Sequence, residues 1–569
     1  MMEVQTGMKS LFSPLRPVLR HRFLLTVATM ACLLTAAGCA RFGDFARNRA
    51  DRAAYGAVRA KQKEAGLTSA LPFSIQAARD EATSRLLTQA GRIGLGQDTF
   101  TTPTYTLSLA DTLAVALANS RDYQTRKETL FSKALDLTKT RYDFGVQESG
   151  SASGDLTRTE TGHGTPSGAT MEVFGKYGLA AGVKKVFATG AQVSLDYTHD
   201  FLRYLTNAPR PSAQNSVSSS VVQPLLRGAG PLVAFEELRQ AERDMIYEVR
   251  DFKRYQQDFV ISVAERYYDL LRARDRMANA NNNLRSANDN WDQIKLLRDA
   301  GIRADLEVDQ AWQRVLEART FKTDAEASYM SQLDGFKVFL GVPLETDLGP
   351  DPKELQAVAA RGLLRPDMKL EDAVNTALQE RLDLKTSEDR VADSERKVHI
   401  ALRDFLPSLD FSYTFNTART DPADEFSLKP RNNTHDLGLG LDLPLDWVPR
   451  RNNYRLALIA FEAAKRAHQQ DRDNAILEVR DGWRQIGRLR QNYEIQVESV
   501  RLAERRVDST QMFLQANRAS ARDVLEAQDA LLTSQNALTD ALVNHTIQRL
   551  RFWTAIERLQ IDPKGMWYE

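Results

Sequence analysis

Short runs of alternating apolar and polar residues recur along the chain and predict β-strands. The run at 409–415 reads LDFSYTF, and the runs at 437–445 and 193–197 read LGLGLDLPL and VSLDY. Each run places large apolar side chains on one face and small or polar side chains on the other. Two-faced strands of this kind fit either a soluble β-sandwich or a transmembrane β-barrel.

Two long stretches without proline, residues 232–342 and 450–562, predict helices. A helix from 232 to 300 would be about 100 Å long at 1.5 Å per residue, which is longer than a compact domain requires. Gly301 and Asn517 mark a break within each stretch, because both residue types tolerate the left-handed turn conformation. Each stretch is therefore expected to form a helical hairpin, with frequent alanines allowing close packing.

The chain contains an internal duplication. Residues 107–123 align with 368–384, pairing Leu109 with Leu370 at an offset of 261, whereas later segments pair Tyr267 with Trp483 at an offset of 216. The first copy therefore holds about 45 additional residues, which must lie between 145 and 230. Each copy follows the order helix, strands, long helices. Each supplies too few strands to close a sandwich or barrel alone, so an assembly is expected.

The joint between strand and helix is marked by proline and glycine in the first copy. Pro224 cannot donate to a β-ladder, so it can end a strand, and Gly228 and Gly230 let the backbone turn into the following helix. Pro444 takes the equivalent place in the second copy, in the segment PLDWVPRR. No glycine follows it there, so the second joint is expected to be built differently.

The N-terminus predicts export. Four basic residues precede the apolar run 23–38, which at 16 residues is shorter than the roughly 20 needed to cross a membrane. Ala36, Ala37 and Gly38 stand directly before Cys39 and resemble a bacterial lipobox, which implies acylation of Cys39. Ordinary signal cleavage nearby is the alternative. Ala40 is compatible with sorting to an outer membrane.

Composition and motifs exclude several function classes. The net charge is +1, which offers no basic footprint for nucleic acid. The seven histidines have no metal-binding spacing, and the chain has neither a paired-cysteine motif nor a phosphate-binding glycine loop after a strand. We therefore expect no enzyme, no metal and no cofactor. An enzyme would be indicated only by a turnover that one His or Asp substitution abolishes.

In this order, and duplicated, the motifs resemble those of the TolC-like outer-membrane efflux proteins over nearly all of residues 105–560. The matching pieces are the helix openings at 107 and 368, QPLLRGAG at 223–230, LPSLDFSYTF from 406, LDLPL from 441 and DVLEAQDALLTSQNAL from 523. The resemblance implies a mostly α-helical fold in which three chains share an antiparallel β-barrel, about four strands from each, and a periplasmic tunnel of long helices.

The resemblance also implies functional residues at the far ends of the helices. Acidic rings that narrow the channel map onto Asp523 and Glu526, with Glu307 and Asp309 as first-copy counterparts, and Arg518 stands near the position of a gating arginine. A solvated helix face is the alternative for these acids. Docking of an adaptor protein maps onto the turns, whose positions are Gly301, Arg303, Ala304, Asn517, Ala519 and Ser520.

The predicted organisation is a signal peptide at 1–38, an extension at 39–104, a first repeat at 105–350, a linker at 351–366 and a second repeat at 367–569. The predicted function is a passive, lipid-anchored outer-membrane duct of a Gram-negative bacterium that receives small molecules from an inner-membrane transporter and an adaptor. A type I protein secretion duct is the alternative within transport. A lipid-tethered periplasmic coiled-coil scaffold is the alternative from another class.

Overall fold

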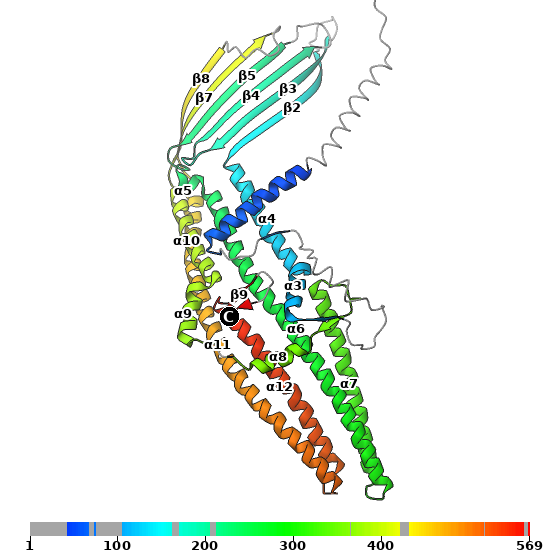
Figure 1. The fold of residues 1–569 in the computed structure, drawn as a ribbon. Coiled ribbons are helices and arrows are strands. Elements are labelled where there is room, and N and C mark those ends of the chain that lie inside the picture. Colours follow the sequence, from blue (N-terminus) through cyan, green and yellow to red (C-terminus); the bar gives the residue numbers. More distant parts are fainter. Residues whose placement is uncertain are drawn as a thin grey trace, which may run out of the picture.

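The protein is elongated, with a β-sheet at one end and helical hairpins at the other (Figure 1). The computed structural model describes residues 43–67, 73–75, 105–161, 170–204, 212–364, 366–421, 432–516, 518–562 and 567–568. No helix in these ranges combines the length and apolar content needed to cross a membrane.

The first repeat runs through two short helices, four strands and a helical hairpin. Its elements are α3 (Leu109–Asn119), α4 (Arg121–Asp143), β2 (Val146–Thr161), β3 (Thr170–Val186), β4 (Gln192–Tyr204), β5 (Ser212–Pro224), α5 (Pro231–Ala234), α6 (Glu236–Asp299) and α7 (Asp305–Leu340). The start of α3 follows from its sequence, because the Ser108 hydroxyl accepts a hydrogen bond from the Asp111 N–H and caps the helix.

The second repeat has the same order with two strands fewer. It consists of α9 (Leu370–Glu380), α10 (Leu382–Arg403), β7 (Ser408–Asp421), β8 (Asn432–Asp442), α11 (Val448–Gln515) and α12 (Ala521–Ala555). Small elements precede, join and follow the repeats. Strand β1 (Tyr105–Leu107) comes before α3 and pairs in parallel with β6 (Leu348–Pro350), which α8 (Lys353–Arg361) follows, and β9 (Gln560–Ile561) and β10 (Trp567–Tyr568) come after α12.

The six long strands form one antiparallel sheet in the order β2-β3-β4-β5-β7-β8. The mostly helical, duplicated fold class is confirmed, but the number of strands is six rather than the expected four or so. The reason is the insertion between residues 145 and 230, which forms a third hairpin within the sheet. The strand expected at 437–445 ends three residues early, at Asp442, before the proline.

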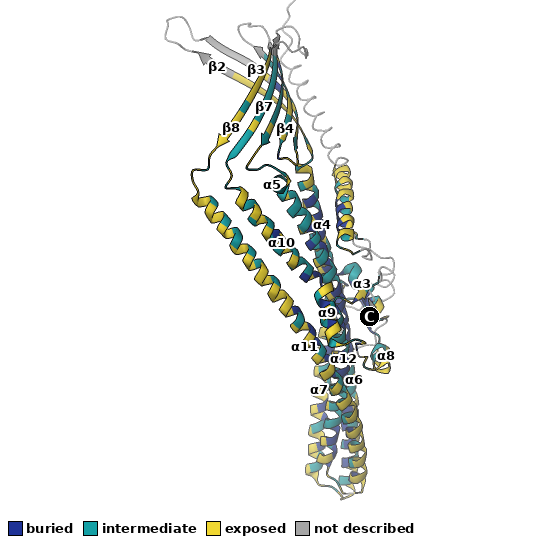
Figure 2. Ribbon diagram, turned by 90° about the vertical axis from the view of Figure 1, so that its left-hand side faces the viewer, coloured by how far each residue is buried: buried dark blue, intermediate teal, exposed yellow. Residues whose placement is uncertain are grey.

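The core is centred on α6, which runs the length of the helical region. Near the sheet α6 lies between α4 and α10, with α11 beyond α10, and near the tips it lies between α7 and α12. Tyr267 of α6 is fully buried, and its hydroxyl donates a 2.9 Å hydrogen bond to the Leu107 carbonyl. Figure 2 shows that buried residues follow this central row of helices, whereas α11 is largely exposed.

The N-terminal extension contains a helix at residues 43–64 that the sequence analysis did not expect. Ala54, Ala57, Val58 and Lys61 are buried and follow helical spacing. The Tyr55 ring lies 5.5 Å from that of Phe131 in α4. The helix therefore packs against the first repeat.

Candidate channel wall, joints and hairpin tips

The sheet has one apolar and one polar face, and its register keeps them in phase across all six strands. Leu195 pairs with Val183 on the first face, whereas Asp196 pairs with Gly182 on the second. The apolar face exposes large side chains that no part of the described chain covers: Leu156, Leu179, Val183, Leu195, Leu437, Leu439 and Leu441. Leu437 is 72% exposed. Such a surface fits contact with lipid.

The first strand–helix joint uses glycine backbone geometry. Pro224 is the last residue of β5 and pairs with Asp410. Gly228 and Gly230 then have φ angles of 84° and 88°, which a residue with a Cβ rarely adopts. Gly230 precedes Pro231, which occupies the first position of α5.

The second joint is built from side chains. Pro444 lies in the connection between β8 and α11, where no residue has a positive φ angle. The rings of Phe405 and Trp447 pack against each other there, with centroids 5.8 Å apart and planes tilted by 39°. Arg450 donates to the Asp404 carbonyl at 2.6 Å. The two joints thus turn the chain by different means.

Arg303 links the two hairpin tips at the far end. Its side chain, only 9% exposed, pairs with Glu307 at 3.2 Å. It also donates a 2.8 Å hydrogen bond to the Ala519 carbonyl, which belongs to the turn of the other repeat. Arg303 therefore lies inside the contact between the turns, whereas Gly301, Ala304 and Ser520 lie on the exposed rim.

Asp523 forms part of a helix cap. The Ser520 hydroxyl and backbone N–H donate to its carboxylate at 2.7 Å and 2.8 Å, while the Asp523 N–H points back to the Ser520 hydroxyl. These hydrogen bonds, the one from the hydroxyl first, hold the pKa of Asp523 below its usual value. This carboxylate stays ionised as the α12 capping box, a structural role that the sequence analysis missed.

Three further candidate gate residues, Glu526, Asp309 and Arg518, are exposed. Glu526 pairs with Arg522 at 3.1 Å and lies 3.9 Å from Arg506, so its charge is matched within the chain. Two predicted residues, Asn517 and Cys39, lie outside the described residues.

A seam of polar contacts joins the first hairpin to the second above the tips. Arg276 of α6 binds both carboxylate oxygens of Asp540 of α12, at 2.8 Å and 2.7 Å. Asn279 donates to Asn536 at 3.0 Å. Further contacts of the same kind join Thr539 to Asp275 and Arg314 to Asp529. Sequence reasoning did not find these pairs, because partners that lie more than about 200 residues apart leave no local signal.

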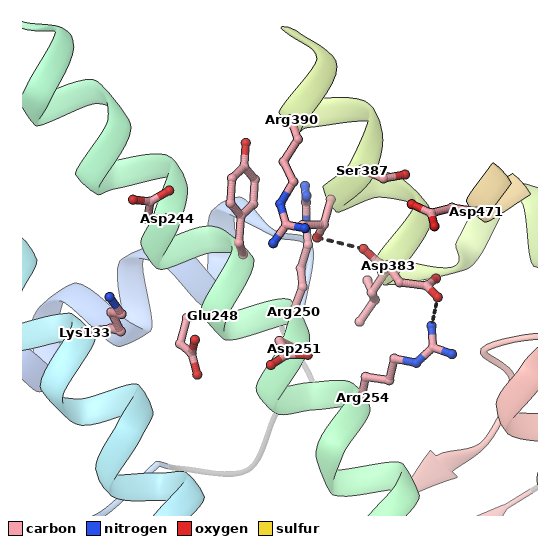
Figure 3. Close-up of a pocket in the computed structure, with 13 residues that line it drawn as sticks. Lys133, Asp244, Glu248, Arg250, Asp251, Arg254, Asp383, Ser387, Arg390 and Asp471 are labelled. Carbon is pink, nitrogen blue, oxygen red and sulfur yellow. Dashed lines mark hydrogen bonds and ion pairs between the residues drawn. The ribbon is translucent and has the colours of Figure 1, made fainter. Parts of the chain in front are cut away.

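A cavity of about 450 Å³ lies between α4, α6 and α10 (Figure 3). Its charged lining mixes the two signs: Lys133, Arg250, Arg254, Arg390, Asp244, Glu248, Asp251, Asp383 and Asp471. Arg250 pairs with Asp389 at 2.6 Å, and Arg254 pairs with Asp383, so ion pairs tie α6 to α10 here. The balance of charge does not favour a ligand of one sign.

A buried polar network lies next to this cavity on the same two helices. The Tyr247 hydroxyl donates to the Asp393 carboxylate, whose side chain is 5% exposed. Burial, and then this hydrogen bond, raise the pKa of Tyr247. Arg243 and Arg396 pair with the same carboxylate, so the buried charge is compensated.

His545 of α12 is packed rather than solvated, at 2% exposed. Burial, followed by the positive charges of Arg549 and Arg490, lowers its pKa to about 4. The imidazole is therefore neutral at physiological pH.

The protein-family model for outer membrane efflux proteins matches residues 192–342 and 373–556, more than half of the chain. Among curated proteins, the alkaline protease secretion protein AprF of Pseudomonas aeruginosa is 24% identical over 342 residues. This match covers 57% of the chain and 66% of AprF, so the chain spans just under two thirds of that relative.

Solved outer-membrane channels have a similar fold. The CusC structure aligns with a TM-score of 0.57 at 15% identity, covering 79% of this chain and 91% of CusC. The CmeC outer membrane channel of Campylobacter jejuni aligns with a TM-score of 0.55 at 16% identity, covering 81% of this chain and 86% of CmeC. At these identities the likeness concerns the fold alone.

Proposed function

The chain belongs to the outer membrane efflux protein family, and from this premise we propose that three copies form a passive export duct through the outer membrane. Their sheets would close into one barrel, and their helices would continue it as a tunnel across the periplasm. The two-faced sheet, whose edge strands β2 and β8 each pair on one side only within the described ranges, carries this proposal, because a barrel needs both an apolar outside and partners for its edges.

The lateral faces of the helical region support the same assembly. Both outermost helices near the tips expose large apolar side chains to solvent in the single chain: Leu306, Trp312, Leu316 and Phe321 on α7, and Leu477, Ile495, Leu502 and Phe513 on α11. Packing α7 of one chain against α11 of the next would cover these residues around a ring.

At the periplasmic end, we assign opening to a relative movement of the two hairpins. The seam between α6 and α12 and the Arg303 bridge would hold the closed arrangement. Glu526, Glu307 and Asp309 are proposed to face the narrow end, whereas Asp523 serves the cap. An adaptor and an inner-membrane transporter would act at the exposed rim, whose residues include Gly301, Ala304 and Ser520.

Export of small molecules is the first candidate for the cargo. Protein secretion is the second, and the similarity to AprF favours it, because that protein is named for the secretion of alkaline protease. The two differ in a deletion strain. Loss of efflux raises sensitivity to toxic small molecules, whereas loss of secretion removes a polypeptide from the medium.

The assembly is tested with protein purified in detergent from outer membranes. We expect a mass of three chains by light scattering and discrete conductance steps in a planar lipid bilayer. A monomer that conducts no ions would overturn the proposal. Acylation of Cys39 is tested separately by the intact mass of the mature chain, which should lose the lipid in Cys39→Ser.

A further inference from the structure

The first repeat carries one hairpin more than the second. Four strands lie between α4 and α6, whereas only β7 and β8 lie between α10 and α11. The additional hairpin, β3–β4, is inserted within the sheet, because β3 pairs with β2 over the whole length of both strands and β4 pairs with β5. Without it, β2 and β5 would form one antiparallel hairpin like that of β7 and β8.

The β3–β4 hairpin has one apolar and one polar face, as expected for strands in a barrel wall and not for a plug or a surface loop. Leu179, Val183 and Leu195 lie on the exposed apolar face, in phase with the neighbouring strands. On the other face Asp196 lies across Gly182, where an added Cβ would collide with its carboxylate. An element that left the sheet would not need to keep this alternation.

We propose that the β3–β4 hairpin sets the size of the outer-membrane exit, because three chains of six strands close an eighteen-stranded barrel instead of a twelve-stranded one. This inference rests on the proposed trimer. The six strands alternate in direction, so β8 of one chain can pair antiparallel with β2 of the next around the whole ring. Barrel diameter grows roughly in proportion to strand number at similar tilt, so the exit is about half as wide again.

The hairpin selects by size rather than by charge. Among its described side chains, the polar face carries two cations, Lys176 and Lys184, and two anions, Asp196 and Asp200, and the register places Glu172 at a further position on this face. Lys176 and Asp200 form an ion pair at 3.4 Å. The hairpin therefore adds width to the lumen while cations and anions are nearly balanced on its polar face, so it admits bulkier cargo of either sign.

The test measures the barrel radius directly. A nitroxide label on Ser218→Cys would lie on the polar face of β5, in the lumen of the closed barrel. Pulsed electron-spin spectroscopy then gives the distance between the three labels, which is proportional to the radius. We expect this distance in the full chain to exceed that in a variant lacking Thr170 to Tyr204 by about 1.5-fold. A label on Ala300→Cys at the tips is the matched control and should give the same distance in both proteins.

Equal Ser218 distances in two trimeric proteins would overturn the inference and leave the duct intact. If labels at neither position 218 nor position 300 give a measurable distance between chains, the trimeric duct itself would be overturned. Because the shortened chain can fail to assemble, the strand count is also read from an electron cryomicroscopy map of the unmodified trimer. Eighteen strands support the inference, and twelve, with the hairpin outside the wall, contradict it.

Discussion

The two repeats share one plan but contribute differently to the folded chain. Helix α6 has 64 residues, of which 21 are buried, whereas its counterpart α11 has 68 residues, of which seven are buried. The difference does not come from length or periodicity, so it reflects position. α6 lies in the middle of the helical row and α11 at its edge, where a neighbouring chain would cover it. Duplication thus yields a core helix and an interface helix from the same plan.

The two repeats also differ in how they build their strand–helix joints and their hairpin tips. The first repeat turns at its joint through Gly228 and Gly230, and the second through packed side chains. At the tips, Ser520 caps α12, whereas Ala304 at the start of α7 offers no side-chain cap. Each asymmetry can be removed or enlarged by one substitution, and the predicted effects differ in size.

The largest effect is expected at matched core positions. Tyr267→Ala removes a fully buried ring and its hydrogen bond to Leu107, which costs about 3–5 kcal/mol. Trp483→Ala, at the equivalent place in α11, removes a ring that is only partly buried and should cost less. The midpoints of thermal unfolding, followed by helical circular dichroism in detergent, measure both. Equal shifts would contradict the division into core and interface helices.

A pH-dependent effect is expected from His545 but not from its counterpart in the first repeat. Its equivalent in the first repeat at the same offset is Tyr329, which is buried but does not titrate in this range. The folded pKa of His545, about 4, lies below the unfolded value of about 6.5. Below pH 6.5 the unfolded chain therefore binds a proton that the folded chain does not, so stability falls as pH decreases to about 4 and is level below that.

The loss amounts to about 3 kcal/mol per chain at pH 4 relative to pH 7. Thermal unfolding across this range should show a steeper decline for the unmodified protein than for His545→Gln, which has no imidazole. Identical pH profiles would mean that His545 is accessible to protons in the folded protein.

An intermediate effect is expected at the first joint. Gly230 has φ 88° and ψ 162°, a conformation that is essentially restricted to glycine, so Gly230→Ala should cost about 1–3 kcal/mol. The cost is conformational, because the nearest atom to an added Cβ is the Arg403 guanidinium at 3.7 Å. Gly335→Ala, in the open interior of α7, is the control and should stabilise by about 1 kcal/mol. If Gly230→Ala leaves the stability unchanged, the first joint does not depend on the backbone freedom of glycine, and the two joints do not differ in this respect.

The sequence predicted the elements whose pattern is local. Alternation located the strands at 193–197 and 409–415, and the absence of proline located α6, α7, α11 and α12 with the turn at Gly301. The offset between repeats located an insertion, and its length matches the hairpin that the sheet contains. Local pattern suffices here because each of these elements buries or exposes a whole face.

The candidate site was less predictable because its contacts join distant segments. The spacing of Ser520 and Asp523 fits a capping box, and the same spacing fits an acid of a channel gate, because the sequence does not distinguish a carboxylate in a helix cap from one in an acidic ring. The sequence predicts a docking position for Arg303, whereas its hydrogen bond to the Ala519 carbonyl is visible only in the fold. Tertiary contacts of this kind depend on how two hairpins lie side by side.

The smallest effect tests whether the tips differ only by one side chain. Ala304 and Ser520 have similar backbone angles, φ −79° and ψ 152° against φ −87° and ψ 161°. Glu307 stands three residues after Ala304, so Ala304→Ser would create the pattern of a capping box. The new hydroxyl needs only the Glu307 N–H, so the ion pair of Glu307 with Arg303 can persist.

We expect Ala304→Ser to stabilise the first turn of α7 by about 1 kcal/mol, and Ser520→Ala to destabilise that of α12 by a similar amount. Amide hydrogen exchange resolves each turn separately, with protection rising or falling about fivefold. If Ala304→Ser leaves exchange unchanged while Ser520→Ala accelerates it, the Arg303 bridge already holds the α7 turn. In that case the two repeats stabilise their tips by different interactions. The Arg303 side chain, which contacts the opposite hairpin, would hold the α7 turn, whereas the Ser520 cap holds the α12 turn, so a new cap on α7 would add no stability.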